Sequence, residues 1–316
     1  MGKIAYILTA YQDPEHLRRL VDALDEHADF FIHVDAKVDI GPFSEKLAGR
    51  SNVHFTEQRY LIQWGGYDQV RSQTELLRCA LATGEEYLRI VCLSGTDYPT
   101  WSNAAIRSEF ESHPGREEII GLNLETCDSA SQKDKVSIYH FGRNLPIANP
   151  AIRRIFSGTS RWVMRCLPFR KPVRAAIGGI PGSVHFGSDY WALGRACAEH
   201  VHGVLSGDPG FAKYFKTAFA PSELCVQTIV FNSPYRERAI LKPGPAYRGL
   251  WELTPLHHIR YGKQIAVMGP ADIDEIAGKP KMFVRKLSST SSGGLYGLLE
   301  RLRSERGGAP VPGLLD

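Results

Sequence analysis

Apolar runs and segments with helical periodicity alternate through the first 125 residues, and this alternation constrains the fold more than any other feature. Five apolar runs predict strands: residues 3–9, "FFIHVDA", "NVHFTE", "YLRIVCLSG" and "EEIIGLNL". Three intervening segments predict helices: "DPEHLRRLVDALDEH", "DQVRSQTELLRCALAT" and residues 103–113. Short strands that alternate with helices predict an α/β fold, with a mostly parallel sheet and helices on both of its faces.

The ends of these strands indicate where a ligand should bind. In parallel sheets, ligands bind beyond the carboxyl ends of the strands. The loops after Thr9, Val34 and Leu93 are therefore the first places where we expect a site. The helix after the first strand has start signals, because Asp13 can cap it and Pro14 fits its first position.

Length and composition fit one large α/β domain, with two smaller domains as the alternative. The chain has 316 residues, of which 43% are hydrophobic and 23% charged. We expect a single domain over residues 1–287, interrupted at 143–185 by an insertion of short helices and loop that is rich in Pro, Gly and Arg. Residues 288–316 are predicted to form a linker, a short charged helix and a loose end.

Charge is distributed unevenly. The net charge of +4 does not indicate a nucleic-acid partner, but no Asp or Glu occurs between Lys135 and Ser188. Eight basic residues lie in that interval: Arg143, Arg153, Arg154, Arg161, Arg165, Arg170, Lys171 and Arg174. Apolar residues separate them, so the segment fits either peripheral contact with an anionic membrane or a solvated insertion that borders an acceptor.

The six cysteines are scattered without a C-x-x-C pair, which favours reduced thiols over disulfides or a zinc site. The N-terminus runs into the first predicted strand without a signal-peptide pattern, and no apolar run is long enough to span a bilayer. We therefore expect a cytoplasmic protein, located at the inner face of the membrane if residues 143–185 contact it.

The stretch "FAPSELCVQTIV" predicts a buried helix that starts near Pro221 and Ser222. Glu223 lies in its first turn, where an acid is favoured by the positive end of the helix dipole. The alternative is a general base that takes a proton from a nucleophile. The stretch by itself favours the electrostatic role.

Seven segments, in order, resemble the core-2/I-branching glycosyltransferases, a family that includes β-1,6-N-acetylglucosaminyltransferases, peptide O-xylosyltransferases and bacterial relatives. They are "YILTAYQDPEHLRRLVDAL", "FIHVDAK", "WGGYDQV", "LSGTDYPTWSN", "FGSDYWAL", "FAPSELCVQTIVFNS" and "MFVRKL". The resemblance covers residues 3–287. It implies a GT-A-like fold, a UDP-sugar donor, inversion at the anomeric carbon and no cofactor. Its best-known N-acetylglucosaminyl members also need no divalent metal.

The resemblance assigns roles to charged residues. Glu223 in Pro221–Glu223 matches the catalytic base, and Lys286 matches a lysine that binds the diphosphate. Arg285 precedes that lysine, and Lys263 or Arg260 is our candidate for a second, upstream cation. Asp272 and Asp274 form the chain's D-x-D, but they open a predicted helix, so we interpret them as capping residues and predict no metal site.

Other positions are candidates for binding the donor or the acceptor. Asp35 and Asp97 follow predicted strands and fit the donor, although a solvated strand end and a turn-forming Asp remain alternatives. Trp251 matches an aromatic residue of the family's acceptor site, since aromatic rings stack on sugars. Ser188 and Trp64 are further candidates for sugar contact, and packing roles are their alternatives.

Two positions depart from the family pattern. Leu253 replaces a second aromatic residue and Tyr11 replaces a frequent His, which puts the mammalian acceptor in doubt. We therefore expect an inverting, metal-independent transfer of N-acetylglucosamine or xylose from a UDP-sugar to a glycan or lipid-linked glycan, in polysaccharide biosynthesis. The alternatives are a non-catalytic nucleotide-sugar- or glycan-binding module and a metal-dependent sugar transferase.

Overall fold

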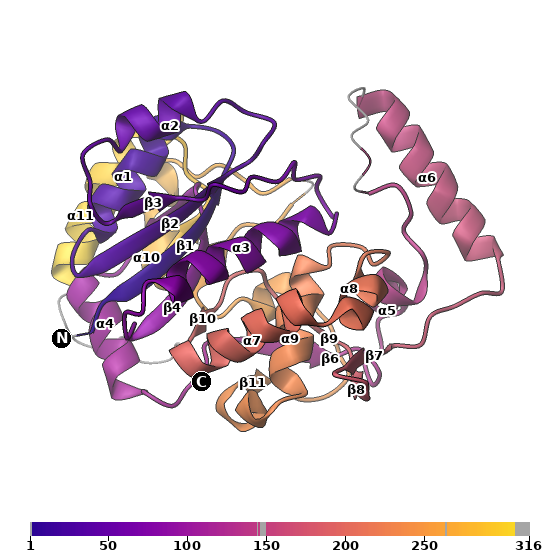
Figure 1. Ribbon diagram of the computed structural model, residues 1–316. Helices are drawn as coiled ribbons and strands as arrows, with labels where there is room; N and C mark the ends of the chain where they lie inside the picture. The colour runs from indigo at the N-terminus through magenta and orange to yellow at the C-terminus, as the bar shows by residue number, and fades with distance from the viewer. Residues whose placement is uncertain (1, 144, 146–149, 263, 307–316) are drawn as a thin grey trace.

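The computed structural model describes residues 2–143, 145, 150–262 and 264–306. Its central sheet has five strands in the order β10-β4-β1-β2-β3. The four parallel strands are β4 (Arg89–Ser94), β1 (Ile4–Ala10), β2 (Ala28–Val34) and β3 (Val53–Phe55), and β10 (Ala192–Leu193) joins antiparallel to β4. The sheet forms the middle layer of the body in Figure 1. The predicted α/β fold with a mostly parallel sheet is confirmed.

Helices cover both faces of this sheet because the side chains of β1 point alternately to opposite sides. Ile4, Tyr6 and Leu8 pack against one set of helices, whereas Ala5 and Ile7 pack against the other. The first set comprises α1 (Pro14–Leu24), α2 (Gly41–Lys46) and α4 (Asn103–Ser112). The second set comprises α3 (Asp68–Ala82), α7 (Arg195–Gly207) and α9 (Ser222–Phe231). The predicted start of α1 is also confirmed, since Asp13 Oδ1 accepts a hydrogen bond from His16 N at 3.0 Å.

Two smaller sheets join distant parts of the chain. In one, β6 (Ile120–Asn123) lies between β11 (Ile240–Leu241) and β9 (His185–Phe186), so "EEIIGLNL" does form a strand, but outside the central sheet. In the other, β13 (Phe283–Arg285) lies between β12 (His257–Ile259) and β5 (Asp97–Pro99). Because β5 follows β4 directly, this third sheet brings the C-terminal part of the chain to the carboxyl edge of the central sheet.

The remaining elements are short helices and turns. They are α8 (Pro209–Phe215), η1 (Pro234–Arg238), η2 (Leu250–Leu253), η3 (Pro270–Asp272) and α10 (Ile273–Ala277).

The basic insertion differs from the predicted short helices and loop. The chain forms α5 (Ala130–Ser137), then one 17-residue helix, α6 (Pro150–Cys166), and then a hairpin of β7 (Arg174–Ile177) and β8 (Ile180–Ser183). Figure 1 shows α6 standing apart from the body. The sequence pattern did not reveal one long helix, because Pro and Gly at the edges of the segment dominate its local signals.

The C-terminal segment contains the predicted short charged helix, but the helix packs on the domain and is not separated from it by a loose linker. Helix α11 (Gly293–Glu305) buries Leu295, Tyr296 and Leu299 in one cluster with Tyr98 of β5. The hydroxyl of Tyr296 lies 2.6 Å from His16 Nδ1 on α1. The helix therefore packs onto the domain, because its apolar residues form a stripe along one face. Residues 307–316 of the predicted loose end lie outside the described residues.

Candidate functional site

Helix α9 presents one carboxylate. Every residue of α9 except Glu223 is buried, so the helix is fixed in the core and only this side chain is partly exposed. The chain enters the helix through Ala220, whose φ of 49° lies in the left-handed region that non-glycine residues rarely adopt. Glu223 N donates to Ala220 O at 3.0 Å, which closes this turn. The predicted helix start is confirmed, and strained backbone of this kind is concentrated at functional sites.

Lys135 holds that carboxylate. Its Nζ on α5 forms a hydrogen-bonded ion pair with Glu223 Oε2, and the two side chains are 14% and 20% exposed. The ammonium also lies 4.0 Å from the centroid of the Phe186 ring. We did not identify Lys135 from the sequence. Its one signal was its place at the start of the acid-free interval, which says nothing about a contact with α9.

A second carboxylate, Asp189, lies near Glu223. It occupies the loop between β9 and β10, and Gly187 N at the start of that loop donates to Glu223 O at 2.9 Å. Only glycine fits there, because a Cβ at position 187 would lie 2.2 Å from Ile120 O. Asp189 Oδ1 is buried and has no hydrogen-bond partner among the residues described.

The surroundings of Asp189 favour its protonated form. Burial, and then the negative charge of Glu223, raise the pKa of Asp189 to about 7. A hydrogen bond from Ser222 and the positive charges of Lys135 and Arg285 act in the opposite direction. Asp189 belongs to the loop in which Gly187 contacts Glu223 of α9 and the Tyr190 ring lies under Arg285 of β13. It is a further residue that our sequence analysis missed, although it lies in the quoted "FGSDYWAL" segment.

Asp97 is buried beside the site and holds the Arg285 side chain in place. Its carboxylate is fully buried, and it accepts from Arg285 Nη1 at 2.9 Å and from His257 Nε2 at 3.0 Å. It also accepts from Ser94 N at 2.7 Å. Burial would raise the pKa of Asp97, but the adjacent His257 and Arg285 hold it below its ordinary value. With no exposed surface, Asp97 positions Arg285 instead of presenting oxygens to a donor.

Arg285 and Lys286 place two cations next to each other. The Arg285 side chain is 11% exposed, donates to Thr96 Oγ1 at 2.9 Å and lies over the Tyr190 ring, 5.2 Å from its centroid. Lys286 is partly exposed, and within the described ranges no carboxylate lies within 4 Å of its Nζ. The segment therefore combines one anchored cation with one that is available to a ligand.

The other predicted donor residues are engaged elsewhere. Asp35 is buried at the end of β2, where Oδ1 accepts from Lys37 N at 3.0 Å and Oδ2 pairs with Lys37 Nζ at 3.3 Å. Arg260 forms ion pairs with Asp272 and Glu275. Lys263 lies outside the described residues.

Asp272 has a capping role, but in the short helix η3 and not at the start of α10, where its side chain makes no capping hydrogen bond. Its Oδ2 accepts from Gly269 N at 2.8 Å at the start of η3, and its Oδ1 accepts from Arg260. In the part of the chain that the structure describes, no three His, Cys, Asp or Glu side chains are grouped so that they could hold a metal ion.

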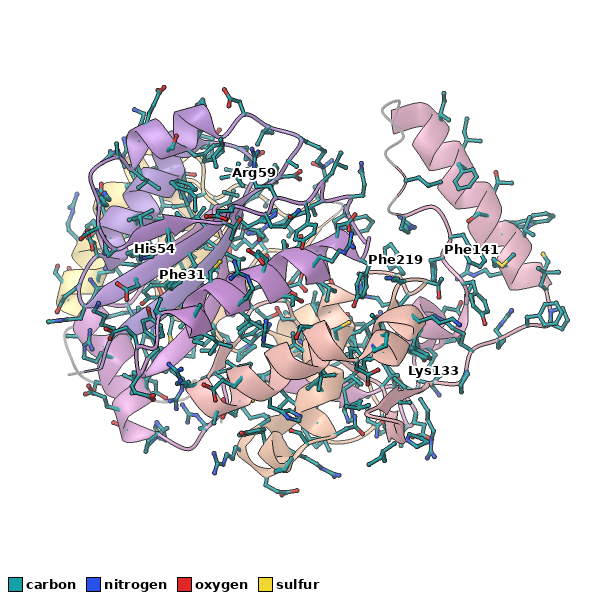
Figure 2. All side chains as sticks on the ribbon, in the orientation of Figure 1. Phe31, His54, Arg59, Lys133, Phe141 and Phe219 are labelled. Atoms are coloured by element: carbon teal, nitrogen blue, oxygen red, sulfur yellow. The ribbon has the colours of Figure 1, made fainter. Side chains whose placement is uncertain are left out.

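Two of the predicted sugar-contact residues, Trp64 and Trp251, are exposed tryptophans. Trp64 is 78% exposed, and its ring meets that of Phe219 edge-on, with centroids 5.1 Å apart. Figure 2 shows Phe219 on the side of the body that faces α6. The neighbouring Gly65 O accepts from Ala220 N at 3.1 Å, which ties Trp64 to the α9 turn. Trp251 in η2 is 58% exposed.

Residues near Trp251 extend the site towards η2. The Tyr247 ring meets the Phe186 ring edge-on, with centroids 5.7 Å apart, and Lys135 Nζ lies over that same Phe186 ring. Burial, and then the charge of Glu223, raise the pKa of Tyr247 to about 12. Leu253 is buried in the core. Ser188 is also buried, and it holds its own loop: Oγ accepts from Tyr190 N at 3.3 Å, and its carbonyl accepts from Gln227 Nε2 at 2.6 Å.

The structure thus unites some of the predicted residues and separates others. Glu223 and Arg285 belong to one cluster with Lys135 and Asp189, and Trp64 borders it. Asp97 and Ser188 are buried and position the cluster. Asp97 accepts a hydrogen bond from Arg285, and Ser188 accepts one within the loop that contains Asp189. Carboxylates beside fixed cations, with aromatic rings at the rim, are suited to proton transfer near an anionic leaving group.

Comparisons with known proteins found a family model and a curated relative that match this chain. The family model described as "Branch: Core-2/I-Branching enzyme" matches residues 4–277. A mouse relative, beta-1,3-galactosyl-O-glycosyl-glycoprotein beta-1,6-N-acetylglucosaminyltransferase 4, is 23% identical over 241 residues. The match covers 72% of this chain and 46% of the relative, so the chain spans about half the length of this curated relative.

Among solved structures, the chain is similar to a putative glucose-1-phosphate thymidylyltransferase from Bacillus anthracis, with a TM-score of 0.36 and 11% identity over 78% of this chain and 87% of that one. It is also similar to a mannose-1-phosphate geranyltransferase from Thermus thermophilus, with a TM-score of 0.30 and 11% identity over 77% and 75% of the two chains. Both scores are too low to support an argument. The family model covers most of the sequence, and the chain therefore belongs to the core-2/I-branching enzyme family.

Proposed function

We propose that this protein is an inverting glycosyltransferase that moves a sugar from a UDP-sugar to a hydroxyl group of a glycan and forms a β-linkage. The observation that carries the proposal is the position of Glu223. It is the only residue of α9 that is not buried, and it lies in one cluster with Lys135, Asp189 and Arg285. A base that acts on a sugar hydroxyl must be held rigidly on one side of the donor, and the buried helix behind Glu223 supplies that rigidity.

The proposed step is a single displacement. The Glu223 carboxylate takes the proton of the acceptor hydroxyl, whose oxygen attacks the anomeric carbon of the donor. The bond from that carbon to the β-phosphate oxygen breaks, and its electron pair leaves with UDP. Attack opposite the leaving group inverts the anomeric centre. Base assistance of this kind contributes roughly 10²–10⁴ in rate.

Side-chain cations receive the charge that develops on UDP, in place of a divalent metal. Asp97 fixes Arg285 for this role, because its carboxylate accepts a hydrogen bond from Arg285 Nη1 at 2.9 Å. Lys286 adds an ammonium group that is available to the ligand. Fixed charges stabilise a leaving group efficiently because they need no reorganisation during the reaction. Both residues belong to β13 or follow it, so the third sheet holds them beyond β4.

The acceptor is proposed to bind against the exposed rings of Trp64 and Trp251, because aromatic faces stack on the apolar faces of sugars. The name of the mouse relative makes N-acetylglucosamine the first donor sugar to test, with xylose as the second. A lipid-linked glycan in cytoplasmic polysaccharide synthesis remains our prediction for the physiological acceptor.

A donor screen tests the proposal. The protein is incubated with UDP-N-acetylglucosamine, UDP-xylose, GDP-mannose and dTDP-glucose, each with glycan acceptors and with EDTA or Mn²⁺, and the released nucleotide is measured. We expect UDP release that depends on acceptor and persists in EDTA. Tight UDP binding without turnover of any donor would favour a binding module. Activity that EDTA abolishes and Mn²⁺ restores would favour a metal-dependent transferase.

A further inference from the structure

Helix α6 presents a stripe of apolar side chains to solvent. The stripe, which we call the α6 stripe, consists of Ile152, Ile155, Phe156, Trp162 and Val163. These positions repeat at the three- and four-residue spacing that places side chains on one helix face. Ile155 is 69% exposed and Trp162 67% exposed. An amphipathic helix in a globular protein normally turns such a face to the core, and a contiguous exposed apolar surface marks an interaction site.

Further exposed apolar residues lie in the chain segments that precede and follow α6. Phe141 is 46% exposed before the helix, and Phe169 is 70% exposed after it. Phe141 lies beside the C-terminal half of α6, where its carbonyl accepts a hydrogen bond from Ser160 Oγ at 3.5 Å, and Figure 2 shows it next to the helix. Ile180 in the β8 strand that follows is 75% exposed. The surface is therefore extended along the helix, and the stripe from residue 152 to residue 163 spans about 17 Å at the usual rise of a helix.

The charge of the same segment selects the partner. Arg165 and Arg170 are exposed, and the sequence adds Arg153, Arg154 and Arg161, while no acidic residue occurs between Lys135 and Ser188. A protein partner would be expected to meet acids as well as bases in a rim of mixed charge. Arg165 does pair with Asp134, but the segment itself holds only basic charges. Exposed Trp, Phe and Ile beside this excess of arginines fit the interface of a negatively charged bilayer, where rings lie among headgroups and cations contact phosphates.

We propose that α6 binds the surface of an anionic membrane, lying parallel to it with the α6 stripe inserted between headgroups and acyl chains. Peripheral attachment is the relevant mode, because none of the helices in the described ranges is both long and apolar enough to cross a bilayer. The surface lies outside the proposed transfer site, so this inference stands or falls independently of the proposed reaction.

Helix α5 connects this surface to the candidate site. Asp134 pairs with Arg165 of α6 at 2.9 Å, and the next residue, Lys135, pairs with Glu223. Membrane-bound α6 therefore holds the cluster around Glu223 close to the bilayer. A glycan carried on a lipid would reach the site there without leaving the membrane.

Vesicle flotation of the full chain tests the proposal. We expect the protein to float with vesicles of roughly one-third phosphatidylglycerol in phosphatidylcholine, and binding to pure phosphatidylcholine to be at least about tenfold weaker. The paired substitutions Ile155→Ser and Trp162→Ser should reduce binding by at least about tenfold. Arg170→Ser should reduce it about fivefold, the effect of one cation near an anionic surface. Leu241→Ser removes a residue that is 39% exposed on β11, far from α6 in sequence, and serves as the matched control.

Two further measurements decide the remaining outcomes. Binding should shift the tryptophan emission to the blue, and Trp162→Phe should remove most of that shift while it preserves flotation. Sedimentation velocity should give the same mass for the parent and for the Ile155→Ser, Trp162→Ser protein. The proposal is overturned if flotation is equal with neutral vesicles or absent with both. It is also overturned if only self-association, or only the KM for a soluble acceptor, responds to the α6 substitutions.

Discussion

Lys135 on α5 and Glu223 on α9 form an ion pair across 88 residues of sequence. The pair orients the carboxylate that we propose as the base, and the ammonium lies over the Phe186 ring at 4.0 Å. The carboxylate therefore has a cation on one side and a buried helix behind it. The Glu223 carboxylate is therefore positioned by two elements, α5 and α9, that belong to different parts of the fold.

Glu223→Gln should nearly abolish transfer, with a loss of roughly 10²–10⁴ in kcat, because the amide cannot accept the acceptor's proton. UDP affinity should stay within about twofold of the parent, measured by calorimetry, since the side chain does not contact the diphosphate in our proposal. Transfer at the parent rate would show that Glu223 is not the base.

Lys135→Met should lower kcat by about 10²-fold or less, because the carboxylate loses the contact that orients it. Lys135→Arg should recover part of the rate, since it restores the positive charge. Lys133→Met on the same helix is the matched control, because no ion pair of Lys133 occurs among the described residues. Equal rates for the two Met variants would remove Lys135 from the site.

Lys286→Ala should weaken UDP binding by about 10- to 100-fold and slow turnover together, because a contact between charged groups is lost. Lys279→Ala, an exposed lysine between α10 and β13, should leave both unchanged. The measurement is UDP affinity by calorimetry alongside steady-state kinetics. Unchanged UDP affinity in Lys286→Ala would exclude it from the diphosphate site.

Asp97→Asn should destabilise the protein by about 3–5 kcal/mol in urea unfolding, because it leaves the buried Arg285 without its carboxylate. The pKa of Asp97 is lowered in the folded state, so its contribution is present above the ordinary carboxyl pKa and is lost as pH falls through the lower value. The free energy of unfolding of Asp97→Asn should therefore lack the decrease that protonation of Asp97 causes in the parent at low pH. A double-mutant cycle with Arg285→Met should give a coupling of about 0.5–3 kcal/mol, and a coupling of zero would contradict the pair.

Asp189 should make stability fall as pH rises. Its pKa of about 7 lies above the ordinary value of 3.8, so the folded protein keeps a proton that the unfolded chain releases at lower pH. The stabilisation that this proton gives the folded state is fully present below the pKa that Asp189 has in the unfolded chain. It is lost as pH rises from about 4 to about 7. Asp189→Asn should therefore gain roughly 2–4 kcal/mol relative to the parent as pH rises through that window. The same difference in unfolding free energy at about pH 4.5 and about pH 8, on either side of most of that window, would refute the assignment.

Local patterns predicted the elements that form the core. Asp13 and Pro14 marked the start of α1, and Pro221 marked the start of α9, because capping and proline geometry act within a few residues. The alternation of short strands with helices predicted that helices cover both faces of the sheet, and the two core clusters confirm it. In contrast, β6 proved to belong to a second sheet and α11 to pack on the domain, since strand partners and helix docking depend on residues far away in sequence.

The site shows the same division at the level of single residues. The sequence determined that Glu223 starts a buried helix, and the family pattern indicated Lys286, because both signals lie within short segments. Only the tertiary structure showed that Lys135 and Asp189 adjoin Glu223 and that Asp97 is buried under Arg285. The physical reason is that propensity and periodicity act over one or two helical turns. An ion pair, in contrast, depends on where two chain segments meet after the sheets have closed.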